Sequence, residues 1–400
     1  MLINKMRFLL LLNFILIGSC TLCAAGNLTG SQDHHGARKI KDIIIYENDL
    51  FYSTFPSVIK NEDGEIIVAF RRAPDRKIFQ EQGSNHVDPN SYLVFVRSRD
   101  NGISWSKEPD LLFAHPFGGS QDPCMLKLKD GQILCTSYGW AFVRESGLGK
   151  IKQPVFSNSE GSVFIGGYVL RSSDNGVSWK GPYYPPNIPP EVKFSALGVP
   201  LPAYNRGALW EGKDGRIFWV VAAGNDRANL SKTANYLLIS KDKGLTWEYS
   251  CPVAKDEKAA FNETSVYETP KGDLVAFLRT AGLDDQACIV RSIDGGQSFG
   301  QWEKMGFQGH PLQALRLPDN RVFLVYGYRH KPYGIRARIL NPECSDYKTA
   351  EEIIIRTDGG NGDIGYPWAV MLDQNRVLVT YYFNIENGTR HIAGTILEIK

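Results

Sequence analysis

The sequence has no excess of charge of either sign, and this lack already narrows its functions. Lysine and arginine number 45 and aspartate and glutamate 43, which leaves a net charge of +2 over 400 residues. Acidic and basic residues are interspersed along the chain, so there is no basic stripe of the kind that neutralises nucleic-acid phosphates. We therefore expect no nucleic-acid partner.

Cysteine is scarce beyond the N-terminal region, and its spacing is typical of neither metal binding nor redox chemistry. The five cysteines are scattered without a Cys-x-x-Cys pair, which indicates neither a zinc site nor a dense disulfide framework. We expect buried thiols that act as small hydrophobic side chains, with no metal site and no cofactor. They are Cys124, Cys135, Cys251, Cys288 and Cys344.

A hydrophobic run long enough to cross a bilayer is also missing. The apolar run at residues 8–17 is too short, and it follows Lys5 and Arg7. This arrangement is typical of an export signal, which we assign to residues 1–25. The run ends at Cys20 in a sequence that resembles a bacterial lipobox, so a lipid-anchored periplasmic or cell-surface protein is one hypothesis. Cleavage near Ala24 or Ala25, which releases a secreted protein, is the other.

No linker rich in proline or glycine, no charge run and no change of composition divides the rest of the chain. The polar stretch from residue 26 to 41 is typical of a tether. Residues 42–400 are therefore expected to form one domain, for which a monomer is the simplest state. A lipid anchor on Cys20 would be its link to a membrane.

A hairpin pattern repeats six times along this domain. Each copy has a short apolar strand, a turn pair such as Asp-Gly, and a second strand rich in Val, Ile, Phe and Tyr. Such pairs favour two-residue turns because both residues can take positive φ. Six hairpins at roughly sixty-residue intervals predict an all-β fold, a six-bladed β-propeller with antiparallel four-stranded blades. The turns are Asp63-Gly64, Asp130-Gly131, Asp214-Gly215, Lys271-Gly272, Asp319-Asn320 and Gln374-Asn375.

A second motif, Ser-x-Asp-x-Gly-x-Ser/Thr-aromatic, is interleaved with the hairpins at residues 98–105, 172–179, 240–247 and 292–299. Its Asp can accept backbone N–H bonds in a tight turn, its Gly supplies positive φ, and its aromatic residue packs between strands. These motifs are Asp-boxes, and from about residue 43 onward the chain resembles the sialidase superfamily of BNR-repeat propellers. Asp-boxes are structural, so they identify the fold and not the chemistry.

Chemistry is expected where the innermost strands begin, because these strand starts converge on one mouth of a propeller's channel. The residues just ahead of the six inner strands are rich in groups that move protons or bind anions. We expect two of them, Asp122 and Arg206, to contact the substrate. The six residues are Thr54, Asp122, Arg206, Glu263, His310 and Tyr366.

Two of these positions match sialidase motifs. Residues 262–268 and the strand ending at Arg279 resemble the stretch in which a Glu precedes a substrate-binding Arg by one hairpin. Residues 365–367 resemble the stretch that carries the catalytic Tyr. The resemblance implies that Tyr366 attacks the anomeric carbon while Glu263 draws away its proton, and that Arg279 binds substrate. A neutral phenol suits sugars that bear a carboxylate, because it avoids repulsion between anions.

The resemblance also implies an acid in the loop after the second strand of the first blade, where sialidases place an Asp. Asp88 and Asp75 both lie in that loop. We assign the acid to Asp88 because it stands nearer the strand that follows.

The pattern departs from sialidases at the carboxylate-binding arginines. Sialidases open the first blade with Phe/Tyr-Arg-Ile-Pro, whereas this chain has Thr54 at the position of the Arg. Arg71 or Arg72, at the end of the same hairpin, are candidates to reach the channel instead. The third arginine of the family would be Arg329 or Arg336, and spacing does not choose between them. Paired arginines suit carboxylates, so a uronic or ulosonic acid could still be held.

His310 is a second departure, since a typical sialidase has no histidine there. It is either a structural side chain or a group that shuttles a proton to, or hydrogen-bonds, a sugar. The main hypothesis is a retaining exo-glycosidase that removes a terminal acidic or unusual sugar, such as sialic or another ulosonic acid, from a glycan. The alternatives are a propeller polysaccharide lyase or His-dependent glycosidase acting on uronic-acid or rhamnose glycans, and a non-catalytic glycan-binding lipoprotein.

Overall fold

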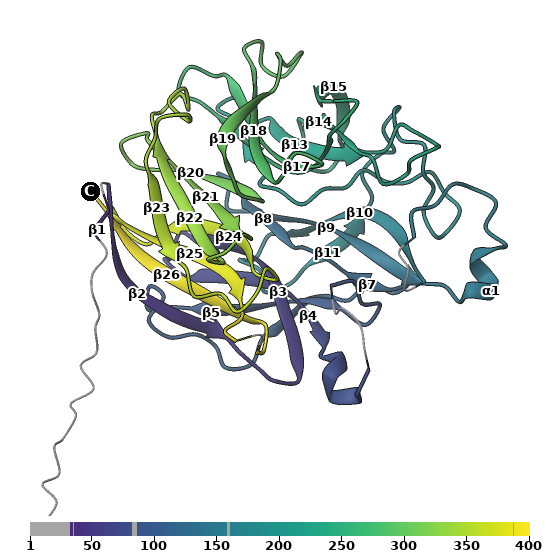
Figure 1. Cartoon of the computed structure of the whole chain (residues 1–400), viewed down its shortest axis with the longest axis horizontal. Coiled ribbons are helices and arrows are strands. Elements are labelled where there is room, and N and C mark those ends of the chain that lie inside the picture. The colour runs from purple at the N-terminus through teal and green to yellow at the C-terminus, as the bar shows by residue number, and fades with distance from the viewer. Residues whose placement is uncertain (1–32, 35, 82–85, 158–160, 387) are drawn as a thin grey trace, which may run out of the picture. The chain divides into compact units, whose positions relative to one another are not determined.

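The computed structural model describes residues 33–400 except 35, 82–85, 158–160 and 387. The predicted export signal and half of the predicted tether therefore lie outside the described residues. The described part is all-β, with six antiparallel sheets that form a six-bladed β-propeller (Figure 1), and the predicted fold class is confirmed. The 3-10 helix η1 (Arg76–Phe79) and the helix α1 (Glu145–Leu148) are short, and no helix within the described ranges is long and apolar enough to cross a membrane.

The first three blades follow one another along the chain, and hairpins join their antiparallel strands. Blade 1 contains β3 (Phe51–Lys60), β4 (Ile66–Pro74), β5 (Tyr92–Ser98) and β6 (Asp110–Phe113). Blade 2 contains β7 (Gly119–Ser120), β8 (Cys124–Lys127), β9 (Ile133–Phe142), β10 (Ser162–Ser172) and β11 (Lys180–Tyr183). Blade 3 contains β12 (Trp210–Glu211), β13 (Ile217–Ala223), β14 (Ala234–Ser240) and β15 (Glu248–Ala254).

The last three blades repeat this order, except that the final blade borrows strands from the N-terminal side. Blade 4 contains β16 (Ala260–Glu268), β17 (Leu274–Ala281), β18 (Gln286–Ser292) and β19 (Glu303–Gln308). Blade 5 contains β20 (Leu312–Arg316), β21 (Val322–Tyr328), β22 (Gly334–Leu340) and β23 (Glu352–Arg356). Blade 6 contains β24 (Gly365–Met371), β25 (Arg376–Phe383), β26 (His391–Ile399), β2 (Ala37–Tyr46) and β1 (Asp33–His34).

The pairing of β2 with β26 closes the ring of blades. Arg38 lies opposite Glu398 in this pairing, and their side chains form an ion pair at 2.7 Å. Because β1 and β2 both belong to blade 6, strands of the propeller begin before residue 42, where its start was predicted. The polar residues at the start of β2 hid the strand, since an outermost strand buries only part of its surface.

The six predicted hairpins are present, but their turns contain three residues and not two. In blade 2 the N–H of Leu128 donates to the carbonyl of Gln132 at 2.8 Å, and Gly131 N–H donates to Leu128 at 2.9 Å. Only the last turn residue needs positive φ, as at Gly131 with φ of 87°. This is a type I turn followed by a left-handed residue, which also matches strand twist.

The four Asp-boxes join the last two strands of each of blades 1 to 4. In the first, Asp100 accepts the N–H groups of Ile103 and Ser104 at 3.1 and 2.9 Å, and Ser104 Oγ donates to it at 2.5 Å. Asp174, Asp242 and Asp294 also accept the N–H and hydroxyl four residues on. These bonds close the turns locally, so the motif is structural as predicted.

The five cysteines beyond the signal are all buried and free, as expected. Cys124 and Cys135, for instance, lie on the adjacent strands β8 and β9 of blade 2. Each packs as a small apolar side chain in a hydrophobic cluster.

Candidate active site

Three inner strands carry a β-bulge near their starts. The pairing with the next strand shifts register in β3, β16 and β24. A bulge bends its strand and turns a side chain that would otherwise follow the alternation of the sheet. The segments at the three shifts lie between Thr54 and Ser57, between Phe261 and Thr264, and between Gly365 and Trp368, so they include Phe55, Glu263 and Tyr366.

Tyr366 and Phe55 also share an unusual backbone conformation. Their φ angles are 52° and 57°, in the left-handed region that bulky residues rarely occupy. Each precedes a proline, and their rings pack with centroids 4.7 Å apart. Backbone of this kind costs about 1–3 kcal/mol and persists only where the surrounding structure holds it. The fold therefore fixes the direction of the Tyr366 side chain.

Tyr366, Glu263 and Arg279 form one hydrogen-bonded group across blades 4 and 6. The hydroxyl of Tyr366 donates to Glu263 Oε1 at 2.5 Å. Arg279 Nη1 donates to Glu263 Oε2 at 2.5 Å and to the Tyr366 oxygen at 3.0 Å. The three residues that the sequence placed at two blade starts and one strand end thus meet at one point.

The electrostatic environment shifts the pKa values of Glu263 and Tyr366 in opposite directions. Burial opposes the ionisation of Glu263, but Arg279 and Arg206 outweigh it and hold the pKa of this carboxyl below its usual value. Burial and the nearby Glu263 raise the pKa of Tyr366 well above its usual value. Glu263 is therefore an anion that accepts the proton of a neutral phenol, which is the arrangement of a nucleophile with its base.

Arg329, which follows β21, also lies near the Tyr366 ring. Its guanidinium carbon is 5.1 Å from the ring centroid, and its Nη2 donates to Tyr382 Oη at 2.8 Å. Arg336, the other candidate, lies elsewhere on blade 5. It donates to the carbonyl of Arg356 at 3.3 Å and lies 3.6 Å from Glu352. The structure therefore brings Arg329, and not Arg336, to the candidate site.

A second set of buried charges lies beside Tyr366, and we call Arg71, Asp122 and Arg206 the polar cluster. Arg206 stacks 4.5 Å from the centroid of the Tyr366 ring and donates to the Tyr366 carbonyl at 3.2 Å. Asp122 Oδ2 accepts from Tyr138 Oη at 2.9 Å. Arg71, on β4, lies opposite Thr54 in the strand register. All three side chains of the polar cluster are buried.

The polar cluster has hydrogen-bonding atoms without partners among the described residues. They are all three guanidinium nitrogens of Arg71, Nε and Nη1 of Arg206, and Oδ1 of Asp122. Burial lowers the pKa of Arg71, although Asp88 and Asp122 act against that effect. Buried polar atoms are nearly always paired in proteins, so a group of this size indicates a place for a polar ligand or ordered water.

Asp88, Asp75 and Arg72 are tied into the structure of blade 1. Asp88 Oδ2 accepts from Arg76 Nε at 3.1 Å, and its Oδ1 accepts from the N–H of Asn90 at 2.8 Å. Asp75 caps η1 by accepting the N–H of Lys77 at 3.0 Å. Arg72 donates to the hydroxyls of Tyr92 and Tyr46, each at 2.9 Å. Only Asp88 is near the polar cluster, through its electrostatic effect on Arg71.

His310 lies at the edge of the site, just ahead of β20. Its Nε2 is 3.3 Å from Asp285 Oδ1, and His330 Nε2 is 3.1 Å from the other oxygen of Asp285. Burial, with Arg279 and Arg329 nearby, lowers the pKa of His310 to about 4 against the opposing effect of Asp285. The imidazole is therefore neutral near pH 7 and is held by a carboxylate.

Sequence reasoning missed His86 and Asp363. The His86 ring packs against Phe55 with centroids 5.1 Å apart, and burial with the nearby Arg329 lowers its pKa to about 4. Asp363 accepts from the hydroxyls of Tyr52 and Tyr382 at 3.0 Å each and from Arg390 at 2.9 Å. His86 was visible two residues before Asp88, but Asp363 gave no signal because its partners come from three distant segments.

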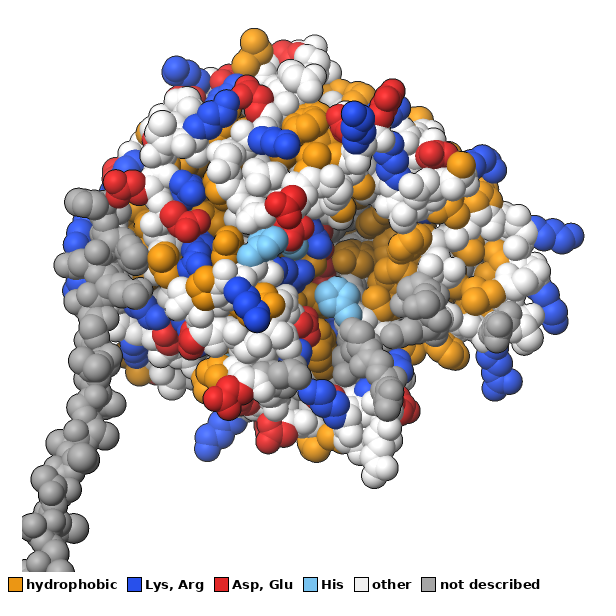
Figure 2. Space-filling model, viewed as in Figure 1, with side chains coloured by type: hydrophobic (Ala, Val, Ile, Leu, Met, Phe, Trp, Pro, Cys, Tyr) orange, Lys and Arg blue, Asp and Glu red, His pale blue; other side chains and the backbone are white. Residues whose placement is uncertain are grey.

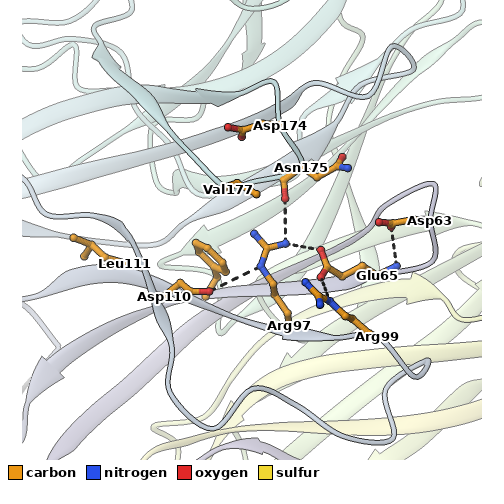
Figure 3. Close-up of a pocket in the computed structure, with 10 residues that line it drawn as sticks. Asp63, Glu65, Arg97, Arg99, Asp110, Leu111, Asp174, Asn175 and Val177 are labelled. Atoms are coloured by element: carbon orange, nitrogen blue, oxygen red, sulfur yellow. Dashed lines mark hydrogen bonds and ion pairs between the residues drawn. The ribbon is translucent and has the colours of Figure 1, made fainter.

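The face of the propeller shown in Figure 2 is hollowed near its centre. Acidic, basic and histidine side chains gather around the hollow, and hydrophobic side chains line the wall nearer β9 and β10. A separate groove of about 620 Å³ lies between blades 1 and 2 (Figure 3). Its two arginines are paired with one carboxylate: Glu65 accepts from Arg97 at 2.5 Å and from Arg99 at 2.9 Å. We therefore place the candidate site at the hollow and not in the groove.

Comparison with solved structures agrees with this architecture. A crystal structure of a protein of unknown function from Dyadobacter fermentans is 67% identical, with a TM-score of 0.89, over 91% of this chain and all of that one. The Hadza microbial sialidase shares 16% identity and a TM-score of 0.61, over 86% of this chain and 65% of its own. The Trypanosoma rangeli sialidase bound to the inhibitor DANA shares 13% identity and a TM-score of 0.60, over 90% and 58%.

Six blades, four Asp-boxes and these structural matches define the protein as a sialidase-type β-propeller. The family of BNR repeat-like domains matches residues 155–379, more than half of the chain, and the protein belongs to that family. No curated protein matches it. The likeness to the two sialidases shows the fold, and the chain spans less than two thirds of their length.

Proposed function

We propose that this protein is a retaining exo-glycosidase that removes a terminal acidic sugar from a glycan, with Tyr366 as nucleophile and Glu263 as its base. The observation that carries the proposal is the hydrogen bond of 2.5 Å from the Tyr366 hydroxyl to Glu263 Oε1, with Arg279 bonded to both groups. A nucleophile within reach of a base that a third group orients is the signature of covalent catalysis.

The arginines of the site support an acidic sugar as the substrate. Arg279 donates to the Tyr366 hydroxyl, Arg329 lies near the Tyr366 ring, and Arg71 and Arg206 lie in the polar cluster with unpaired N–H groups. Guanidinium groups bind carboxylates through charge-assisted hydrogen bonds. Arg71 stands opposite Thr54, where sialidases have an arginine, so a cation is present on the neighbouring strand. A uronic or ulosonic acid fits this set of donors.

The test is turnover of aryl glycosides of sialic acid, other ulosonic acids, glucuronic acid, galacturonic acid and rhamnose. Tyr366→Phe should reduce release of the acidic sugar by at least about 10³-fold, because the nucleophilic oxygen is gone. Tyr381→Phe is the matched control, since its hydroxyl bonds to Thr395 on blade 6, outside the site. Full activity of Tyr366→Phe on the sugar that the wild type releases would refute the proposal.

A propeller lyase is the second candidate function, and the neutral His310 held by Asp285 favours it. A neutral imidazole can take the proton next to a uronate carboxylate in an elimination. Under this hypothesis His310→Ala abolishes the appearance of unsaturated ends on uronic-acid polysaccharides, whereas Tyr366→Phe is tolerated. Under the glycosidase proposal no unsaturated ends form, and Tyr366→Phe is the variant that loses activity.

A further inference from the structure

A glycosidase of this kind needs a group that protonates the leaving oxygen, and the two buried aspartates near the site differ in their capacity to do so. Both oxygens of Asp88 serve as acceptors within their own loop, one from Arg76 Nε and one from Asn90 N–H. A carboxylate used in this way orders the loop and the base of η1. Each Asp88 oxygen is thus already engaged by a donor of its own loop.

Asp122 is in the opposite situation. Its side chain is 1% exposed, its Oδ2 accepts from Tyr138, and its Oδ1 has no partner among the described residues. Because Tyr138 donates to Oδ2, the vacant position for a proton is on Oδ1. Burial removes the water that would stabilise the anion, so the neutral acid is favoured.

The charged and titratable neighbours of Asp122 come from several blades, and they shift its pKa in both directions. Burial and then Glu263 raise the pKa of Asp122 to about 7, while Arg206, Tyr138 and Arg71 act against them. A group that titrates near neutral pH can both give and take back a proton during a reaction cycle. The titratable and charged groups that interact with it are Arg71, Cys124, Tyr138, Arg206, Glu263 and Tyr366.

We propose that Asp122 is the proton donor to the departing glycosidic oxygen and that Tyr138 positions it. This inference rests on the proposed glycosidase function and adds the acid to it. It also replaces the assignment of Asp88 to that role. Asp122 touches the reacting atoms, whereas Tyr138 acts through its hydrogen bond to Asp122 Oδ2.

The two steps balance with the groups present. First, the Tyr366 oxygen bonds to the anomeric carbon as its proton passes to Glu263, the glycosidic C–O bond breaks, and the Asp122 proton moves to the departing oxygen. The leaving group departs as a neutral alcohol. Second, the Asp122 carboxylate takes a proton from water, whose oxygen bonds to the anomeric carbon. The bond to Tyr366 breaks, and its oxygen recovers the proton from Glu263.

This assignment also gives the leaving group a location. The ring of Tyr138 belongs to an aromatic cluster of blade 2 in which Phe164 lies 4.9 Å from Trp140 and 4.5 Å from Tyr204, centroid to centroid. An apolar wall beside the acid would contact the face of the departing sugar. Hydrophobic side chains line the hollow on the side of β9 and β10 (Figure 2).

The experiment compares Asp122→Asn with Asp88→Asn on substrates that differ only in the leaving group. Asp122→Asn should lower kcat/KM by about 10²-fold or more for a sugar leaving group that needs protonation, and by less than about tenfold for dinitrophenol, which does not. Asp88→Asn should show no such dependence. An equal loss on all leaving groups with Asp122→Asn, or a leaving-group dependence with Asp88→Asn, would overturn the inference.

Three further measurements keep this test independent of the proposed function. Tyr366→Phe should lose activity on every leaving group, so a failure of the nucleophile assignment is distinguished from a failure of the acid assignment. The infrared band of a protonated carboxyl should titrate near pH 7 in the wild type without substrate and disappear in Asp122→Asn. Tyr138→Phe should shift the basic limb of the pH profile upward, because it removes a donor to the carboxylate. A wild type without that band, or an unmoved limb in Tyr138→Phe, would contradict the inference.

Discussion

The groove between blades 1 and 2 and the hollow above the channel both contain charged side chains. Those of the groove include paired arginines, whereas buried charges of the candidate site lack partners among the described residues. In the groove, Glu65 is bonded to Arg97 and Arg99, and Arg97 donates onward to the carbonyls of Asn175 and Gly176 at 3.1 and 2.9 Å (Figure 3). At the candidate site, the guanidinium of Arg71 has no hydrogen-bond partner among the described residues, although it is fully buried.

The difference teaches that the pairing of charges, and not the size of a cavity, separates the groove from the candidate site. Paired charges at the groove join the Asp-box of blade 2 to blade 1, which stabilises the fold. Unpaired buried charges at the hollow cost stability, and a fold retains them when a ligand supplies the missing partners. The following predictions test this contrast, from the largest expected effect to the smallest.

The largest effect expected is on the pH dependence of stability through Asp122. Its pKa is about 7 in the fold and about 4 in an unfolded chain, so the folded state binds more protons between these values. Unfolding therefore becomes easier as pH rises from 4 to 7, by on the order of 4 kcal/mol at the upper end. Asp122→Asn should flatten this slope in chemical denaturation series at pH 4 to 8. An unchanged slope would show that Asp122 is ionised throughout.

The next effect is at the groove. Glu65→Ala should lower the free energy of unfolding by about 2–3 kcal/mol, because Arg97 loses a charged partner in a largely buried place. Catalytic activity should stay unchanged. Glu62→Ala is the matched control, since Glu62 is 79% exposed and lies 3.7 Å from Lys127. The two variants are compared by urea denaturation, and equal stabilities would remove the distinction between groove and hollow.

The third prediction is a gain in stability at the candidate site, opposite in sign to the loss expected at the groove. Arg71→Met should raise the stability by about 1–3 kcal/mol, because it replaces an unpaired buried cation with an apolar chain. It should also lower kcat/KM for an acidic sugar by about 10- to 100-fold. Arg72→Met, on the same strand, should lower the stability and leave kcat/KM unchanged, since it removes bonds to Tyr92 and Tyr46 but no site group. A destabilised Arg71→Met protein would mean that the guanidinium has partners in solution.

The smallest effect concerns an Asp-box. Asp242→Ala removes the acceptor for the N–H groups of Leu245 and Thr246 at 3.1 and 2.8 Å, so it should cost about 1 kcal/mol of stability. Turnover at 25 °C should be unaltered. Thermal denaturation with an activity assay measures both, and a loss of turnover without a loss of stability would place the Asp-box in the chemistry.

Much of the fold could be predicted because its repeats depend on contacts within a few residues. All the acceptor bonds of Asp100 lie inside its own motif, so the sequence shows them directly. The turn length was wrong because Asp-Gly fits both hairpin types, and the twist of the paired strands chooses between them. The start of the propeller was predicted too late in the chain, because β2 is recognisable as a strand only through its pairing with β26 at the far end of the chain.

The candidate site was predictable only in part, for the same reason. Tyr366, Glu263 and Arg279 were assigned from motifs, and the structure places them within hydrogen-bonding distance. The choice of Arg329 over Arg336 depends on which one faces the Tyr366 ring. Spacing along blade 5 does not contain that information.

The sequence by itself determined a six-bladed propeller with Asp-boxes and a Tyr, a Glu and an Arg at strand starts and ends, because these features follow from local turn chemistry and period. Only the tertiary structure decided which charges remain unpaired. Arg71, Asp122 and Arg206 come from three blades, and their burial and missing partners exist only once the ring has closed. Burial sets the pKa of Asp122, and burial is a property of the assembled blades and not of any one segment.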